Sequence, residues 1–137
     1  MTRSSGESSL ILGLLHDHPV AYRPDLARAI GSVAAGIMLS QALYWDGVIR
    51  RSPGENDGWF YKTGQEWENE TGMGRREQET ARRILRGKGV LEEKRQGIGG
   101  LIYYRVNIDN LVSLLASYYA DPSDTPTQPR RQRNKLM

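Results

Sequence analysis

Five of the twelve residues from Arg75 to Arg86 are arginines, and their types and spacing are suited to binding phosphates or bases. A guanidinium group carries a planar fork of N–H donors that can bind a phosphate, or the edge of a guanine base, through two hydrogen bonds. On a helix, successive side chains turn by about 100°. One face then carries Ala81, Ile84 and Leu85. The other carries Arg76, Glu79, Arg83 and Arg86, with Arg75 and Arg82 at one margin and Thr80 at the other.

The N-terminal half of a DNA-reading helix usually meets the bases. The candidates for contacts in a groove are therefore Arg75, Arg76, Glu79, Thr80 and Arg83. Arg82 and Arg86, on the same helix, are expected DNA contacts as well. The Glu79 carboxylate could accept a hydrogen bond from a cytosine amino group, but an ion pair with Arg83 one helical turn away is the simpler interpretation. Gly74 stands at the N-cap, and the free N–H groups after it favour a phosphate. The alternative is that the arginines only keep the helix soluble.

A Gly-rich hairpin follows, with strands predicted over Val90–Arg95 and Leu101–Asn107. The polar residues that lead into its tip are Lys94, Arg95 and Gln96. Such a hairpin could lie on the DNA backbone or in the minor groove, or be an ordinary hairpin. Arg105 could contact a phosphate or pair with an acid.

Local signals predict the elements that position these side chains. A short strand over Trp59–Lys62 precedes a helix that Thr63 opens, because Thr63 and Glu66 have the spacing of a capping box. Gly72 supplies a left-handed turn, and the Arg-rich helix stops at Gly87 and Gly89. Lys62 and Thr63, at the start of the first helix, could contact a phosphate. Strand, helix, turn, helix and hairpin in this order predict a winged helix-turn-helix.

The N-terminal half is predicted to be helical. Leu10–His16 could be a short helix that Pro19 ends, and Val20–Tyr22 a brief extended piece. Pro24 is well placed to open a helix to Ile30. Ser32 then caps a long helix over 33–49, which is apolar on more than one face and should lie at the centre. Its small residues Ala34, Ala35 and Gly36 would let a neighbouring backbone approach closely.

The C-terminal part changes character at Asp121. Before it, Asp109 can cap a helix to Tyr119, whose apolar residues Leu111, Val112, Leu114 and Leu115 pack back on the core. Residues 121–137 hold three prolines and few apolar residues, so we expect a disordered basic tail. We expect flexibility over 1–8, one domain over 9–120, and a surface loop over 52–58.

The charge distribution favours a polyanionic partner. The formal net charge is only +3, but residues 55–70 hold five acids and one lysine, whereas 75–95 hold eight bases and four acids. A basic stripe beside an acidic one suits a polyanion bound in one orientation. There is no cysteine, which excludes disulfides and thiolate metal sites. The apolar run Leu10–Leu15 is too short to span a bilayer and has no cleavage site, so we expect a cytoplasmic protein away from membranes.

Catalytic interpretations are weaker. His16, Asp17 and His18 point in different directions and no further ligand cluster follows, so we expect no metal. A DNA nickase would need an acidic metal partner that is not evident. Tyr103 and Tyr104 point to opposite faces of a strand, so we expect one in the core and the other in cross-strand packing or in contact with a phosphate. No Gly-rich phosphate loop precedes a helix. The tryptophans Trp45, Trp59 and Trp67 fit a core better than base stacking. We therefore expect no enzymatic activity, no catalytic residue and no cofactor.

Several segments resemble one family. LSQALYWDG (39–47), DGWFYKTGQEWENETG (57–72), RREQETARRIL (75–85) and GVLEEKR…LIYYRVN (89–107) resemble winged-helix replication initiators, or replisome organisers, of phages and plasmids, also found among prophage-encoded regulators. The resemblance covers roughly residues 19–115 and implies binding of origin or operator DNA through the helix Arg75–Arg86. The chain departs from the family at Gly74, where a capping serine is usual. It also lacks the large C-terminal domain that recruits a helicase or loader, which implies a stand-alone domain, a fragment or an accessory protein.

The sequence thus predicts a mainly α protein with a small β-sheet: a winged helix-turn-helix of about five helices and a two- to three-stranded wing hairpin. The expected function is binding of double-stranded DNA in phage or plasmid replication initiation. The alternatives are a transcriptional repressor or regulator, and a module that binds a replication or host protein. A homodimer could form through Leu10–Leu15 or Leu111–Tyr119, or both segments could pack on the core.

Overall fold

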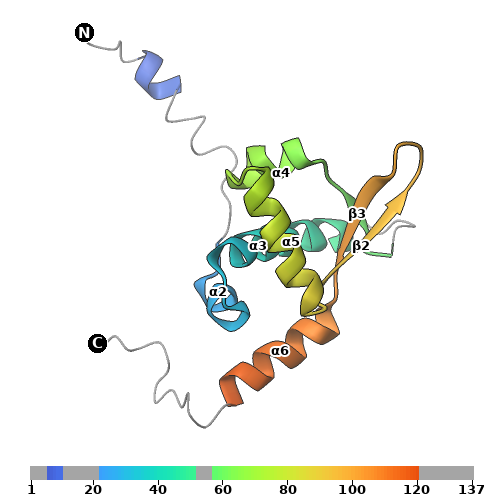
Figure 1. Ribbon diagram of the computed structural model, residues 1–137. Helices are drawn as coiled ribbons and strands as arrows, with labels where there is room; N and C mark the ends of the chain where they lie inside the picture. Colours follow the sequence, from blue (N-terminus) through green and yellow to red (C-terminus); the bar gives the residue numbers. More distant parts are fainter. Residues whose placement is uncertain (1–5, 11–21, 52–56, 121–137) are drawn as a thin grey trace.

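The computed structural model describes residues 6–10, 22–51 and 57–120, with the side chains of 50 and 51 excepted. This part is mainly helical with a three-stranded antiparallel sheet, which confirms the coarse fold class (Figure 1). A helical stretch over 6–10 is followed by helices α2 (Pro24–Ile30), α3 (Val33–Arg51), α4 (Gly64–Thr71), α5 (Arg75–Gly87) and α6 (Ile108–Ala120). The strands are β1 (Phe60–Tyr61), β2 (Leu91–Gln96) and β3 (Leu101–Val106).

Helix α3 lies at the centre, as its apolar composition predicts. It packs against α2, α4, α5, β1 and β3. Gly36 is pressed against α2: a Cβ atom at this position would lie 2.6 Å from the Ala27 Cβ and 2.7 Å from its Cα. The close approach expected at the small residues of α3 is therefore confirmed.

Local capping signals account for the helix boundaries. The Ser32 hydroxyl accepts from the Ala35 N–H at 3.1 Å. Thr63 and Glu66 form the predicted capping box, in which the Thr63 Oγ1 accepts from the Glu66 N–H at 3.0 Å and the Glu66 carboxylate accepts from the Thr63 N–H at 2.9 Å. Gly72 ends α4 in the left-handed region with φ 79°. These interactions place the α4–α5 corner at the residue where the sequence predicts it.

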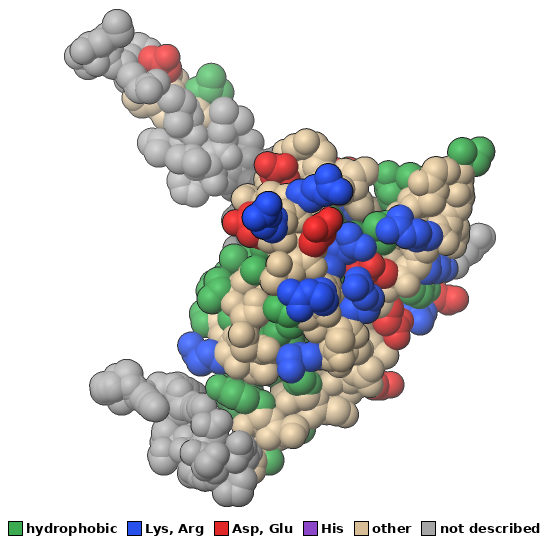
Figure 2. Space-filling model, viewed as in Figure 1, with side chains coloured by type: hydrophobic (Ala, Val, Ile, Leu, Met, Phe, Trp, Pro, Cys, Tyr) green, Lys and Arg blue, Asp and Glu red, His purple; other side chains and the backbone are tan. Residues whose placement is uncertain are grey.

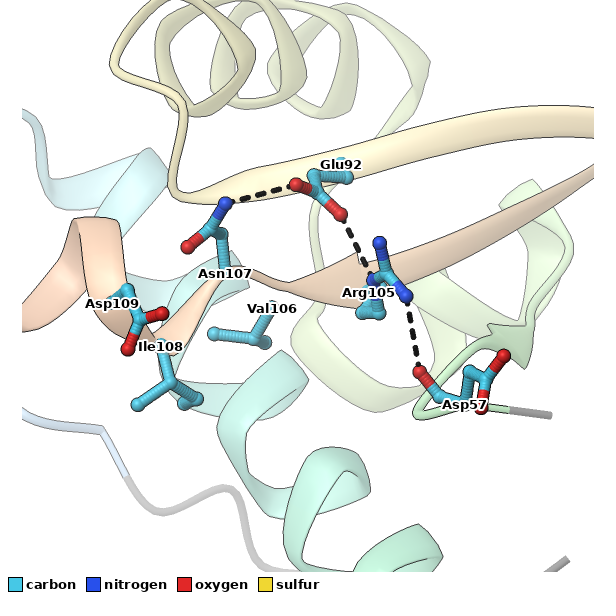
Figure 3. A pocket seen from close by; sticks show the side chains of 7 residues that line it. All are labelled: Asp57, Glu92, Arg105, Val106, Asn107, Ile108 and Asp109. Atoms are coloured by element: carbon cyan, nitrogen blue, oxygen red, sulfur yellow. Dashed lines mark hydrogen bonds and ion pairs between the residues drawn. The ribbon is translucent and has the colours of Figure 1, made fainter.

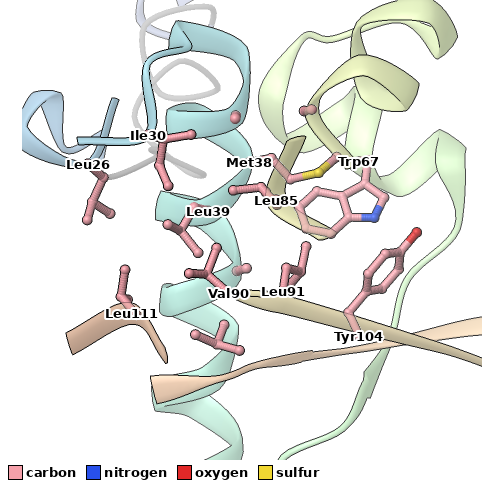
Figure 4. Close-up of a cluster of buried hydrophobic side chains, with 14 of the residues drawn as sticks. Leu26, Ile30, Met38, Leu39, Trp67, Leu85, Val90, Leu91, Tyr104 and Leu111 are labelled. Atoms are coloured by element: carbon pink, nitrogen blue, oxygen red, sulfur yellow. The ribbon is translucent and has the colours of Figure 1, made fainter. Parts of the chain in front are cut away.

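The sheet has the order β1-β3-β2. Tyr104 pairs with Phe60 and faces the core, whereas Tyr103 pairs with Tyr61 on the other face, their ring centroids 5.5 Å apart. The predicted alternation of the two tyrosines is confirmed. The core between helices and sheet is shown in Figure 4, and its largest fully buried side chains include Trp67, Met38, Leu39, Leu85 and Leu91.

Several expectations need correction. Residues 6–8 lie in a helical stretch, and the flexibility expected over 1–8 stays a prediction. The cap of α6 is Asn107 rather than Asp109, because the Asn107 Oδ1 accepts from the Asn110 N–H at 2.9 Å. Val112 is 58% exposed and does not pack back on the core. Trp67 is buried as predicted, but Trp59 is only partly buried and lies outside the core cluster.

Other predictions fall outside the described residues. They concern the short helix before Pro19, the His16–Asp17–His18 segment, most of the 52–58 loop, and the tail after Ala120. In the described ranges, no helix is both long and apolar enough to cross a membrane.

Candidate nucleic-acid interface

Helix α5 is anchored to the α4–α5 corner by Gln78. The buried Gln78 side chain donates through Nε2 to the Gly64 carbonyl at 3.0 Å and to the Met73 carbonyl at 2.8 Å. Met73 fills the corner beneath it and is 6% exposed. Because Ala81 and Leu85 on the same face are fully buried, the opposite face of α5 is held towards solvent.

That outer face carries three exposed arginines. Arg75 has a side chain 92% exposed, and its one ion pair with a described residue is a long contact, 3.4 Å, with the Glu79 carboxylate. Arg76 and Arg83 are exposed and make no hydrogen bond or ion pair with any other described residue. Figure 2 shows Lys and Arg side chains gathered over α5 and the neighbouring hairpin. The structure brings these predicted residues together on one accessible surface, which we call the α5 face: Arg75, Arg76, Glu79 and Arg83.

Glu79 pairs in the direction opposite to the expected one. Its carboxylate contacts Arg75, four residues earlier, rather than Arg83, four residues later. Arg83 therefore remains available for another partner. Thr80, also predicted to face a groove, is partly buried at the margin of the helix.

Arg82 and Arg86 bind a carboxylate of the hairpin. The Arg82 guanidinium donates to both oxygens of Glu93 at 2.9 and 2.8 Å, and Arg86 Nη1 donates to the same carboxylate at 3.3 Å. The side chains of Arg82 and Glu93 are 20% and 13% exposed. Burial by itself would raise the pKa of the Glu93 carboxyl, but the hydrogen bonds and charges of the two arginines outweigh it and hold this pKa below its usual 4.5. Arg82 thus fixes α5 against β2, and its expected role as a DNA contact gives way to that of a positioning residue.

This assignment predicts different effects for neighbouring arginines. Arg82→Ala is expected to lower the free energy of unfolding by about 2 kcal/mol, because it removes a bidentate, largely buried ion pair. Arg76→Ala, on the exposed face, is expected to change it by less than about 0.5 kcal/mol. Urea unfolding followed by circular dichroism measures both. Equal effects at the two positions would contradict the assignment.

The hairpin carries a second cationic group on the outer face of the sheet. Lys94 Nζ and the guanidinium carbon of Arg105 each lie 4.5 Å from the centre of the Trp59 ring. Arg105 also donates to the Glu92 carboxylate at 2.9 Å, so it pairs with an acid, one of the two roles considered for it. Arg95 and Gln96 are exposed near the tip, where Arg95 donates to the Gly100 carbonyl at 3.2 Å. Trp59, expected in the core, instead makes cation–π contacts with Lys94 and Arg105.

Lys62 does not reach the surface. Its side chain is 4% exposed, its Nζ lies 2.6 Å from Glu70 Oε2, and it sits 4.2 Å from the centre of the Trp45 ring. A lysine enclosed in this way cannot reach a phosphate, so the expected contact at Lys62 is corrected to a buried ion pair. Thr63 beside it is occupied as the cap of α4.

Lys88 is an exposed cation that the helical pattern alone does not predict to be part of the interface. Lys88 follows the last residue of α5, is exposed, and has no ion pair in the described ranges. In the sequence, the one indication of this role is that Lys88 directly follows a cationic helix. It extends the positive surface to the C-terminal end of α5.

The open pocket of about 580 Å³ in Figure 3 has a different chemistry. Its carboxylates come from Asp57, Glu92 and Asp109, and Glu92 is already bound by Arg105 and by the Asn107 amide. Such a lining repels a phosphate. In the part of the chain that the structure describes, no three His, Cys, Asp or Glu side chains are grouped to hold a metal ion.

No family of known proteins, no curated protein and no solved structure shows a significant match to this chain.

Proposed function

We propose that this protein binds double-stranded DNA through the α5 face. The observation that carries the proposal is that Arg76 and Arg83 are exposed and pair with no other described residue, on a helix whose other face is buried. Guanidinium groups held on a rigid helix can bind phosphates and read guanine edges in the major groove. Two further exposed cations, Arg75 and Lys88, lie at the two ends of α5 and would add attraction that does not depend on base sequence.

We interpret α4, Gly72 and α5 as a helix-turn-helix and the β2–β3 hairpin as a wing. In support, the element order is β1, α4, α5, β2, β3, and the Arg82–Glu93 pair holds the hairpin against α5. Rigid coupling of the two would let helix and hairpin contact one duplex together. The fold proposed is thus a winged helix-turn-helix.

The acids of α4 give the complex an orientation. Glu66 and Glu68 are exposed on α4, next to the cationic α5. A phosphate backbone lying across α4 would meet like charge, whereas one lying along α5 would meet arginines. The DNA should therefore approach α5 and the hairpin, not the outer side of α4.

The biological role proposed is replication initiation in a phage or plasmid, which rests on the segments that resemble initiators. A transcriptional repressor would use the same surface, and only the identity of the bound site separates the two. A protein-binding module is the third candidate. Binding of a protein through an apolar contact would differ from DNA binding, because its affinity would not fall steeply as the salt concentration rises.

The test is a fluorescence-anisotropy titration of labelled mixed-sequence duplex DNA at several salt concentrations. Wild-type binding should weaken steeply with salt. Arg76→Ala/Arg83→Ala should bind at least about tenfold more weakly, since hydrogen bonds to charged groups contribute on the order of 1.5–3 kcal/mol each.

The matched control is Arg23→Ala/Arg28→Ala, which removes the same charge from exposed residues at α2. It should retain most of the affinity. No binding at low salt by folded wild-type protein would reject DNA binding and favour a protein partner. Equal losses in both double variants would show that net charge, and not the α5 face, determines binding.

A further inference from the structure

The tip of the β2–β3 hairpin presents a single side chain. Three of its four residues are glycines, Gly97, Gly99 and Gly100, with φ of 84°, 85° and 65°. Backbone in this left-handed region strongly favours glycine. The remaining residue, Ile98, is 98% exposed, more than any other large hydrophobic side chain described. The tip is therefore a narrow backbone turn that carries one branched apolar group into solvent.

Cations and hydrogen-bonding groups surround the base of this tip. Arg95 and Gln96 precede it, Lys94 lies further along β2, and all three are exposed. Leu101, which follows the tip, is 38% exposed. In Figure 2, hydrophobic side chains at the far end of the hairpin are seen from the same side as the Lys and Arg side chains over α5. An apolar point with a cationic base is thus displayed next to the α5 face.

This combination matches what is needed to enter the minor groove. Proteins that bind there insert apolar side chains, isoleucine among them, between adjacent base pairs, and so unstack and kink the duplex. Glycines on both sides of the wedge allow the backbone to approach the groove walls closely. Basic residues behind the wedge can bind the phosphates that line the groove.

We propose that Ile98 is a wedge that enters the minor groove beside the site of α5 and bends the DNA. The inference rests on the proposed function and adds to it the form of DNA that the protein prefers, namely a bent or easily kinked duplex. Pyrimidine–purine steps are the most easily unstacked and are the expected point of insertion.

The geometry favours DNA over a protein partner. A stable protein interface buries about 800 Å² on each partner around a cluster of apolar residues. The tip offers one isoleucine between glycines, with charged residues behind it. A minor groove needs only a single wedge, so the small apolar area is sufficient there.

The test is ligase-catalysed circularisation of DNA fragments of about 120 bp, which are shorter than the persistence length and close rarely unless bent. It needs no known binding site. Full-length wild-type protein should increase circle formation, and Ile98→Ser should reduce this increase at least about threefold while anisotropy shows binding within about threefold of wild type, because the wedge bends the DNA and the arginines supply most of the affinity.

Two matched variants complete the experiment. Ile98→Met keeps an apolar side chain that can insert, and should preserve circle formation. Val112→Ser makes a similar exposed aliphatic-to-serine change on α6 and should also preserve it. Circle formation by Ile98→Ser equal to wild type, or wild-type protein that binds DNA without promoting circles, would overturn the wedge and leave DNA binding intact. Failure of wild type to bind in the anisotropy assay would reject the proposed function and the wedge together.

Discussion

Glu70→Ala is expected to lower the free energy of unfolding by about 3 kcal/mol, because it leaves the buried Lys62 ammonium without its counter-charge. Glu70 joins three elements: its carboxylate accepts from Gln41 at 2.6 Å and Trp45 Nε1 at 2.9 Å on α3, and from Lys62 at 2.6 Å after β1. All three donors would lose their acceptor at once. Urea unfolding of the variant and wild type at neutral pH measures the loss.

A double-mutant cycle separates the charge from the packing. Lys62→Met/Glu70→Gln removes both charges, keeps an amide oxygen for Gln41 and Trp45, and retains an unbranched chain against the tryptophan ring. We expect the double variant to be more stable than Glu70→Ala and Glu70→Gln, since apolar replacements of buried ion pairs are often neutral. If Glu70→Gln alone is as stable as wild type, the ion pair contributes little.

The same carboxylate should make the protein sensitive to acid. Burial by itself raises the pKa of Glu70, but hydrogen bonds from Lys62, Trp45 and Gln41 outweigh it and leave the pKa below its ordinary 4.5. Stability from this group is therefore complete above pH 4.5 and is lost as pH falls through the lower, folded-state pKa. The pKa of Glu93 is also lowered, so its contribution to stability is likewise lost as pH falls. Lys62→Met/Glu70→Gln should lose less stability than wild type between pH 5 and pH 3, with the Glu93 contribution remaining.

Features that depend on neighbours in the sequence could be predicted, and those that depend on distant pairs could not. Ser32, the Thr63–Glu66 box and Gly72 act within one helical turn, so their spacing alone places the helix ends. Lys62 lies between β1 and α4 and Glu70 on α4, eight residues later, and nothing local shows that they meet. A lysine just before a helix therefore predicts a phosphate contact, whereas in the fold Lys62 is the buried partner of an acid.

In the candidate site, too, local features could be predicted from the sequence and distant pairs could not. The wheel of α5 correctly separates its buried and exposed faces, because helical periodicity alone determines them. It cannot show that Glu93, eleven residues after Arg82, binds two of the arginines. The choice of Glu79 between Arg75 and Arg83, both four residues away, also depends on side-chain rotamers that no spacing shows. Spacing predicts which arginines are exposed, and the fold determines which of them pair with Glu93.

Gly36→Ala is expected to cost about 2 kcal/mol of folding free energy, although alanine is the better helix former. Alanine should gain up to about 1 kcal/mol in the helix interior. The added Cβ, however, would lie 2.6 Å from the Ala27 Cβ and 2.7 Å from its Cα, so α2 must move away from α3. Such a movement would also stretch the hydrogen bond from the Arg23 N–H to the Ser40 hydroxyl, 3.0 Å long, across the same interface.

Two variants determine whether the backbone contact is the cause. Gly87→Ala adds a methyl group at the end of α5, where nothing lies within 4 Å, and should leave stability unchanged or slightly higher. Ala27→Gly/Gly36→Ala removes the methyl–methyl clash but retains the contact with the Ala27 Cα, so it should remain well below the stability of Ala27→Gly alone. Full recovery in that double variant would show that α2 can shift to accept a side chain, and that the tight α2–α3 contact is not required for the fold.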